Sequence, residues 1–249
     1  MLKIQNIHKS FGEQKVLNGV SFELEKGKVY TLVGGNGSGK TTLFNIITGF
    51  LKADSGTIEY KSQVLNHKSP VEINKLGITR TFQDLRIIKN ITVRENILLA
   101  LNRNHSASIF KEFINFSKQD YTKAIEIIEQ VSLTSEKDSL ADEISYGQQK
   151  LLTIGCCLAN NSEVLLLDEP IAGIDKVNYQ KIKSLIESIS KEHSKYILQI
   201  EHNLEFIKET SNQIIFLNAG KDFVFDDYNI SNKAGYYIAL KPYSYFESK

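Results

Sequence analysis

The chain has 249 residues, of which 41% are hydrophobic and 24% are charged, and its 30 basic side chains nearly balance its 29 acidic ones. This composition is that of an ordinary globular protein, and it excludes collagen, a coiled coil and a disordered chain. The length allows one or two domains at about 150 residues each. Because the formal net charge is only +1, composition gives no reason to expect nucleic acid as a partner.

The sequence indicates neither disulfides nor a membrane span. Its two cysteines, Cys156 and Cys157, are neighbours that cannot comfortably bridge to each other, and we expect them to pack within a helix in a reducing compartment. No apolar run approaches the roughly 18 to 20 residues that a membrane helix needs. The first residues alternate like a strand and lack the apolar core of a secretory signal. We therefore expect a soluble protein, or one that touches a membrane only through another molecule.

The first third of the chain predicts strands followed by a helix. Residues 1–25 are expected to form strands of a half-exposed sheet, because apolar and polar side chains alternate there. Residues 29–33 form a continuous apolar run, which is typical of a strand buried on both faces. One helix face is then predicted by four apolar residues at helical spacing: Leu43, Ile46, Ile47 and Phe50. Residues 57–65 predict one or two further strands.

The rest of the chain alternates between helical and strand patterns. Candidate helices lie at 95–101, 110–116, 121–131, 147–159 and 176–191. Fully apolar strands are expected at 164–167 and 196–200, and a hairpin at 214–217 and 223–225. Strands that alternate with helices in this way predict a doubly wound α/β core.

Residues 34–41, G-G-N-G-S-G-K-T, fit the phosphate-loop pattern G-x-x-x-x-G-K-S/T in the required context, between a buried strand and a helix. Glycines let backbone N–H groups turn toward a phosphate, and the helix that begins at Lys40 adds its positive end. Lys40 is expected to reach the β- and γ-phosphates, and the Thr41 hydroxyl to bind Mg²⁺. The alternative, a glycine-rich turn that matches by chance, is disfavoured by this context. The expected nucleotide contacts are Gly34, Gly35, Asn36, Gly37, Ser38, Gly39, Lys40, Thr41 and Thr42.

Two carboxylates, Asp168 and Glu169, follow the apolar run 164–167. Ligands of open α/β sheets bind at this carboxyl edge of the strands. Asp168 is expected to hold Mg²⁺ through water, and Glu169 to polarise the water that attacks the γ-phosphate. In isolation, a solvated strand end or a helix cap would be the better interpretation. The phosphate loop in the same chain favours the functional one.

The segment 144–150, I-S-Y-G-Q-Q-K, resembles the L-S-G-G-Q signature of ATP-binding cassette (ABC) ATPases. With the two motifs above, the resemblance covers nearly the whole chain in the right order. Four more positions match the family: Phe11 the aromatic that stacks on adenine, Gln83 the Q-loop, Asp175 the D-loop and His202 the switch histidine. Kinases and GTPases share the phosphate loop but lack this set.

The resemblance implies an α/β fold: a P-loop NTPase (RecA-like) core of ABC ATPase type, with an antiparallel β subdomain and an inserted α-helical subdomain. It implies a single cassette in this chain. Residues 1–83 and 161–249 would form the nucleotide-binding core with the β subdomain, and residues 84–160 the helical subdomain with the signature.

For the chemistry, the resemblance implies ATP and Mg²⁺ as cofactors and ATP hydrolysis as the reaction. Glu169, His202, Lys40 and Gln83 would be the catalytic residues. Thr41, Gln83 and Asp168 would hold Mg²⁺. On its own, each of these polar residues has an ordinary structural interpretation, and the lone histidine most of all.

The spacing of Ser145 and Gln148 predicts a capping box at the start of the next helix. In the simplest interpretation that is the whole role of Ser145. A helix start with the N–H of Gly147 is also a ready anion site. In the family this site, including Gln148, meets the γ-phosphate bound by a partner subunit, so the resemblance implies head-to-tail dimers that enclose two ATP molecules.

The segment 80–83, R-T-F-Q, combined with Y-G-Q-Q at 146–149 looks most like the ATP-binding subunits of branched-chain amino acid importers. This implies separate membrane permease subunits as partners, indirectly a solute-binding protein, and a peripheral place on the cytoplasmic face of the membrane. Three alternatives stay open: a cassette of another transport system, a non-transport cassette of DNA repair or translation, and a module that binds ATP without hydrolysing it.

Overall fold

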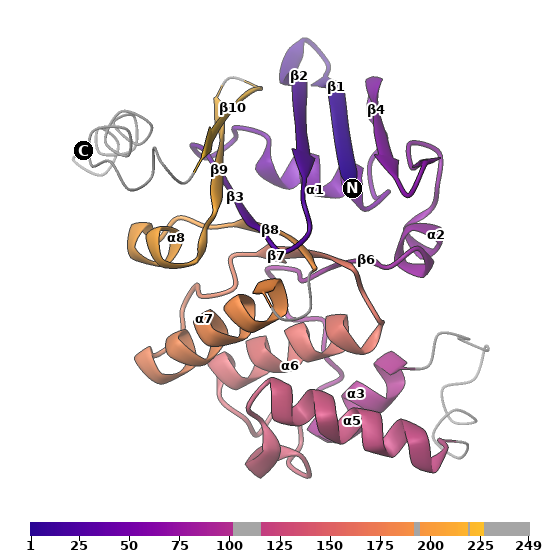
Figure 1. Ribbon diagram of the computed structural model, residues 1–249, viewed down its shortest axis with the longest axis vertical. Coiled ribbons are helices and arrows are strands. Elements are labelled where there is room, and N and C mark those ends of the chain that lie inside the picture. The colour runs from indigo at the N-terminus through magenta and orange to yellow at the C-terminus, as the bar shows by residue number, and fades with distance from the viewer. Residues whose placement is uncertain (102–115, 192–194, 219, 227–249) are drawn as a thin grey trace. The chain divides into compact units, whose positions relative to one another are not determined.

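The computed structural model describes residues 1–101, 116–191, 195–218 and 220–226 (Figure 1). The chain divides into two compact units: the first unit is Met1–Ile73 with Ile189–Lys249, and the second unit is Asn74–Ser188. The predicted helix at 110–116 lies outside the described ranges except for its last residue. The subdomain boundaries expected at 84 and 160 stay a prediction. Within the described ranges, none of the helices combines the length and the apolar character that a bilayer crossing requires.

The first unit contains an antiparallel sheet with the strand order β2-β1-β4-β5, of which Figure 1 labels β2, β1 and β4. Its strands are β1 (Leu2–Phe11), β2 (Gln14–Leu24), β4 (Ser55–Tyr60) and β5 (Gln63–Val64). Ile4 of β1 pairs with Phe22 on one side and with Ile58 on the other, and all three side chains are buried. The alternation in the sequence thus produces one apolar row across three strands, which confirms the predicted sheet.

The same unit contains parallel strands. Their bounds are β3 (Val29–Val33), β8 (Tyr196–Ile200) and β9 (Gln213–Asn218), with β10 (Lys221–Asp226) antiparallel to β9. β3 pairs in parallel with both β8 and β9. Every residue of β3 and β8 is buried, as their continuous apolar runs predict. The hairpin of β9 and β10 is confirmed.

Two helices of the first unit follow parallel strands: α1 (Lys40–Ile47) after β3 and α8 (Leu204–Thr210) after β8. The predicted apolar face of α1 is confirmed for Leu43, Ile46 and Ile47, which are buried. The prediction is wrong for Phe50, which is 52% exposed. α1 ends early because Gly49 has a φ of 75°, and a Cβ there would lie 2.8 Å from the carbonyl oxygen of Lys68. α8 was not predicted from the sequence.

In the second unit β6 (Ile78–Arg80) pairs in parallel with β7 (Val164–Asp168). The helices are α2 (Pro70–Lys75), which leads into this unit, and α3 (Val93–Leu101), α5 (Lys118–Gln130), α6 (Tyr146–Ala159) and α7 (Lys176–Lys191), with the short 3₁₀ helix η1 (Thr134–Glu136). α3, α5 and α6 pack together (Figure 1). Gly155 permits this close packing, because a Cβ there would lie 2.9 Å from the Cδ1 of Ile97.

Both cysteines lie on α6, as expected. Cys157 is buried, and burial raises the pKa of its thiol to about 12. Burial also raises the pKa of Cys156. The thiolate is the reactive form of cysteine, so this environment suits packing and disfavours thiol chemistry.

Candidate functional site

The phosphate loop, residues 34–41, connects β3 to α1 in the first unit. Two of its glycines are required by close contacts: a Cβ at Gly34 would lie 2.4 Å from the carbonyl oxygen of Leu217, and a Cβ at Gly39, whose φ is 103°, would lie 2.7 Å from the Cδ2 of Leu17. At Gly35 and Gly37 a Cβ would meet nothing within 4 Å. The loop is therefore packed on one side and open on the other.

Two side chains of the loop are suited to phosphate. The ammonium group of Lys40, a residue only 8% exposed, donates to the carbonyl oxygens of Gly34 at 2.7 Å and Gly35 at 3.0 Å. The Ser38 hydroxyl oxygen is buried and has no hydrogen-bond partner among the described residues. A buried hydroxyl without a partner is costly, and a phosphate oxygen would satisfy it. The loop thus fits a nucleotide phosphate.

Phe11 is the last residue of β1, where it pairs with Gln14. The turn begins only at Gly12, because β1 and β2 stay paired to their ends. The Phe11 side chain is 51% exposed, and the ammonium group of Lys9 lies 5.6 Å from the centre of its ring. An exposed aromatic face is what stacking on a base requires.

His202 lies beyond the carboxyl end of β8. Leu32 of β3 pairs in parallel with Ile200 of β8, so Gly34 and His202 each follow that pair by two residues at the same edge of the sheet. The backbone N–H of His202 donates to the carboxylate of Glu201 at 3.1 Å. The structure therefore brings His202 to the sheet edge that carries the phosphate loop.

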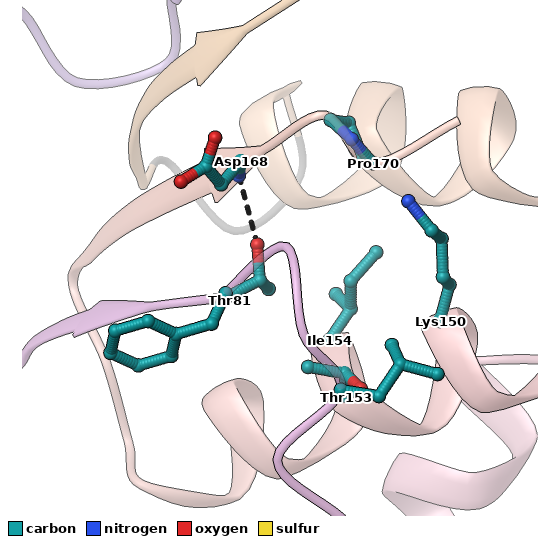
Figure 2. Close-up of a pocket in the computed structure, with 8 residues that line it drawn as sticks. Thr81, Lys150, Thr153, Ile154, Asp168 and Pro170 are labelled. Atoms are coloured by element: carbon teal, nitrogen blue, oxygen red, sulfur yellow. Dashed lines mark hydrogen bonds between the residues drawn. The ribbon is translucent and has the colours of Figure 1, made fainter. Parts of the chain in front are cut away.

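In the second unit, Asp168 ends β7 and is 7% exposed. Its carboxylate accepts a hydrogen bond from Arg80 at 2.7 Å, in a pair whose side chains are 4% and 8% exposed. Its backbone N–H donates to the hydroxyl of Thr81 at 2.9 Å (Figure 2). The family resemblance includes Arg80 and Thr81 but does not imply that they hold Asp168. The signal for this contact is that Arg80 ends the strand that pairs with β7.

Glu169 has a φ of 48°, in the left-handed region that disfavours residues other than glycine. Such a conformation costs about 1 to 3 kcal/mol and must be held by its surroundings. The side-chain amide of Gln83 donates to the Glu169 carboxylate at 3.3 Å. The structure thus brings together Gln83 and Glu169, two of the residues that the resemblance implies to be catalytic.

A small pocket lies beside this strand end (Figure 2). Its lining residues come from the end of β7, from the segments that follow β6 and β7, and from α6: Thr81, Phe82, Leu85, Lys150, Thr153, Ile154, Asp168 and Pro170. The ammonium group of Lys150 donates to the carbonyl oxygen of Glu169 at 2.5 Å. This contact was not predicted from the sequence.

The predicted capping box at the start of α6 is confirmed. The Ser145 hydroxyl accepts from the N–H of Gln148 at 3.3 Å, and the Gln148 side chain accepts from the N–H of Ser145 at 2.8 Å. A Cβ at Gly147 would lie 2.7 Å from the Cβ of Asn178, so only glycine fits here.

Asp175 caps α7. Its carboxylate accepts from the backbone N–H groups of Val177 at 2.9 Å and Asn178 at 3.0 Å, and from the Asn178 amide. The hydrogen bonds from Asn178 hold the pKa of Asp175 below its usual value. The matched D-loop position thus has a clear structural role in this chain.

The predicted Mg²⁺ ligands are divided between the two units: Thr41 lies in the first unit, and Gln83 and Asp168 lie in the second. A hydroxyl, an amide oxygen and a carboxylate are hard oxygen donors that suit Mg²⁺. Their joint coordination of the ion stays a prediction.

A phosphate loop at the carboxyl edge of parallel strands, with an acidic strand end and a capped signature helix, defines a P-loop ATPase of the ABC class. The model of the ABC transporter family matches residues 17–172. The branched-chain amino acid transport ATP-binding protein BraF of Pseudomonas aeruginosa is 33% identical over 226 residues, which are 88% of this chain and 89% of that protein. The probable LivG protein of Methanocaldococcus jannaschii is 38% identical over 211 residues, which are 83% and 82% of the two chains.

A crystal structure of MJ1267, an ATP-binding cassette of an ABC transporter, in its ADP conformation superimposes with a TM-score of 0.85. It is 33% identical in sequence, and the match covers 98% of each chain. The chain therefore belongs to the ABC transporter family, as an ATP-binding cassette with ATPase activity. The fold class expected from the sequence is confirmed.

Proposed function

We propose that this chain hydrolyses Mg-ATP at a site built from the phosphate loop, Asp168, Glu169, Gln83 and His202. Lys40 would bind the β- and γ-phosphates, and Glu169 would take a proton from the attacking water. Thr41, Gln83 and Asp168 would hold Mg²⁺, which neutralises phosphate charge when bound. The observation that carries this proposal is the open phosphate loop, with its buried Ser38 hydroxyl and the Lys40 ammonium group.

Two cassettes would associate head to tail around two ATP molecules. The capped start of α6 supports this, because the helix N-terminus presents the Ser145 hydroxyl and the N–H of Gly147, which together suit a phosphate of a second subunit. ATP binding would close the dimer and hydrolysis would open it. ATP can shift this equilibrium only by its differential affinity for the two states.

The transported solutes would be branched-chain or related amino acids, taken up by a system in which separate permease subunits cross the membrane. The relatives named above support this assignment, since they match most of the chain and are named for branched-chain amino acid transport. The cassette would lie on the cytoplasmic face of the membrane, and a solute-binding protein would deliver the substrate to the permease. Residues 84–160 would form the helical subdomain and contact the permease, linked to the γ-phosphate through Gln83.

Co-purification tests the transport assignment. A tagged chain, expressed in its native host and extracted in mild detergent, is expected to retain polytopic membrane proteins, and reconstituted vesicles are expected to take up leucine, isoleucine or valine when ATP is supplied. Uptake of another solute class would indicate a cassette of a different transport system. A chain that hydrolyses ATP but retains no membrane protein would favour a non-transport role.

Replacing Ser145 with alanine tests the role of the signature helix. Loss of the N-cap is expected to lower the free energy of unfolding by about 1 kcal/mol, and loss of the phosphate contact is expected to lower ATPase activity as well. Ser117 provides a matched control, because it forms a second capping box with Asp120 at the start of α5. Ser117→Ala should cost similar stability, measured by urea unfolding, and leave ATPase activity unchanged. Equal activity in both variants would contradict a phosphate-binding role for Ser145.

A further inference from the structure

Lys150 is a buried cation on α6, the helix that begins in the signature segment. It contacts Glu169, the residue that follows the end of β7. Lys150 is 5% exposed. A buried ammonium group is costly unless strong acceptors surround it. The carbonyl oxygen of Glu169 is one such acceptor, at 2.5 Å from the Lys150 nitrogen, and the ring of Tyr146 is another, with its centre 5.5 Å from that nitrogen. All three residues belong to the second unit.

A neutral donor within the turn also contacts the carbonyl group of Glu169. The backbone N–H of Ala172 donates to it at 3.3 Å, which is longer than a good N–H···O bond. The residue after Glu169 is Pro170, and Glu169 itself has the left-handed φ of 48°. A charged donor is stronger than a neutral one. The Lys150 bond therefore fixes the peptide group of a residue whose backbone is in an unfavourable conformation.

Tyr146 connects the same helix to the segment that follows Glu169. A Cβ placed at Gly173 would lie 3.5 Å from the ring of Tyr146. The first two turns of α6 thus make two contacts: Lys150 reaches the carbonyl oxygen of Glu169 after the end of β7, and the Tyr146 ring lies beside Gly173 in the segment that follows. A movement of this helix start would be transmitted to the peptide group of Glu169.

We propose that Lys150 is a positioning residue for hydrolysis, which sets the direction of the Glu169 carboxylate from the signature helix of the same chain. Its ammonium group fixes the Glu169 carbonyl, and the carboxylate on the same Cα is thereby held against Gln83, which donates to it at 3.3 Å. A phosphate bound at Ser145 would then influence the geometry of Glu169 through one turn of α6. This inference rests on the proposed role of Glu169 as the base.

Steady-state hydrolysis by the full chain tests the inference with Lys150→Met, which keeps the length of the side chain and removes its charge. Misplacement of a catalytic group by about 1 Å can cost about 100-fold in rate, so kcat is expected to fall about 10- to 100-fold. KM and the equilibrium affinity for a fluorescent ATP analogue are expected to stay at the wild-type values. Lys150→Arg, which retains a charged donor, is expected to restore most of kcat.

Lys181 provides the matched control. Its ammonium group also donates to a backbone carbonyl in the second unit, that of Ser132 at 3.3 Å, but in an exposed position. Lys181→Met is expected to keep the wild-type kcat. In a Glu169→Gln background, Lys150→Met is expected to have no further effect on the residual rate, because Lys150 acts through Glu169.

A wild-type kcat in Lys150→Met would overturn the inference, and so would an equal loss of kcat with and without the Glu169→Gln change. If Lys150→Met does not fold, as judged by thermal unfolding, Lys150→Gln is measured in its place with the same expectations. Normal turnover by Glu169→Gln itself would instead refute the proposed base. An inactive Glu169→Gln together with a fully active Lys150→Met would refute only the role of Lys150.

Discussion

Glu169→Gln is expected to bind ATP as the wild type does and to lose most of its turnover. The amide has nearly the shape of the carboxylate and can still contact Gln83, but it cannot accept the proton of the attacking water. General-base catalysis contributes about 10²- to 10⁴-fold, so the rate of phosphate release should fall by that amount. Because hydrolysis is blocked while ATP still binds, the closed dimer should accumulate and elute early in size-exclusion chromatography with Mg-ATP.

Glu143→Gln is a suitable control for this experiment. Glu143 is an exposed residue of the second unit that accepts from the backbone N–H of Leu140 at 3.2 Å. The same chemical change there should leave both turnover and elution unchanged. Normal hydrolysis by Glu169→Gln would show that another group is the base.

Lys40→Ala is expected to weaken ATP binding itself. The change removes a buried ammonium group placed across the phosphate loop. A hydrogen bond to a charged group contributes about 1.5 to 3 kcal/mol, which corresponds to a dissociation constant raised about 10- to 150-fold. Isothermal titration calorimetry with ATP measures the change directly.

The controls for Lys40→Ala must show whether weaker ATP binding comes from the lost phosphate contact or from unfolding of the loop. Lys52→Ala, at an exposed position in the same unit, is expected to keep the wild-type affinity. Thermal unfolding without nucleotide shows whether the loop variant is still folded. A folded Lys40→Ala protein with unchanged ATP affinity would refute the assignment of the phosphate loop.

The parts of the site encoded by contiguous residues could be predicted from the sequence. The run 29–33, the glycines of the phosphate loop and the start of α1 are adjacent in the chain, and hydrophobic period and glycine spacing are local signals. The capping box of Ser145 is local in the same sense. Its hydrogen bonds join residues three positions apart.

The contacts that hold the acidic strand end could not be predicted, because they join residues from different elements. Arg80 and Asp168 are 88 positions apart, and Lys150 and Glu169 are 19 apart. Periodicity shows which face of an element is apolar, but not which polar side chain a neighbouring element will bring. α8 has only seven residues, too few for a clear helical period. The predicted apolar face of α1 wrongly included Phe50, because Phe50 has helical spacing. Hydrophobic spacing alone does not reveal the left-handed turn at Gly49 that ends the helix.

The Ser38 hydroxyl also has a thermodynamic consequence for the whole protein. Its oxygen is buried without a partner among the described residues, so a phosphate oxygen that reached it would remove the cost of burying it alone. A ligand that binds only the folded state stabilises that state by about 4 kcal/mol at 1,000 times its dissociation constant. Under those conditions ATP is a structural component of the cassette as well as its substrate, and depletion of ATP would lower the protein's resistance to unfolding and proteolysis.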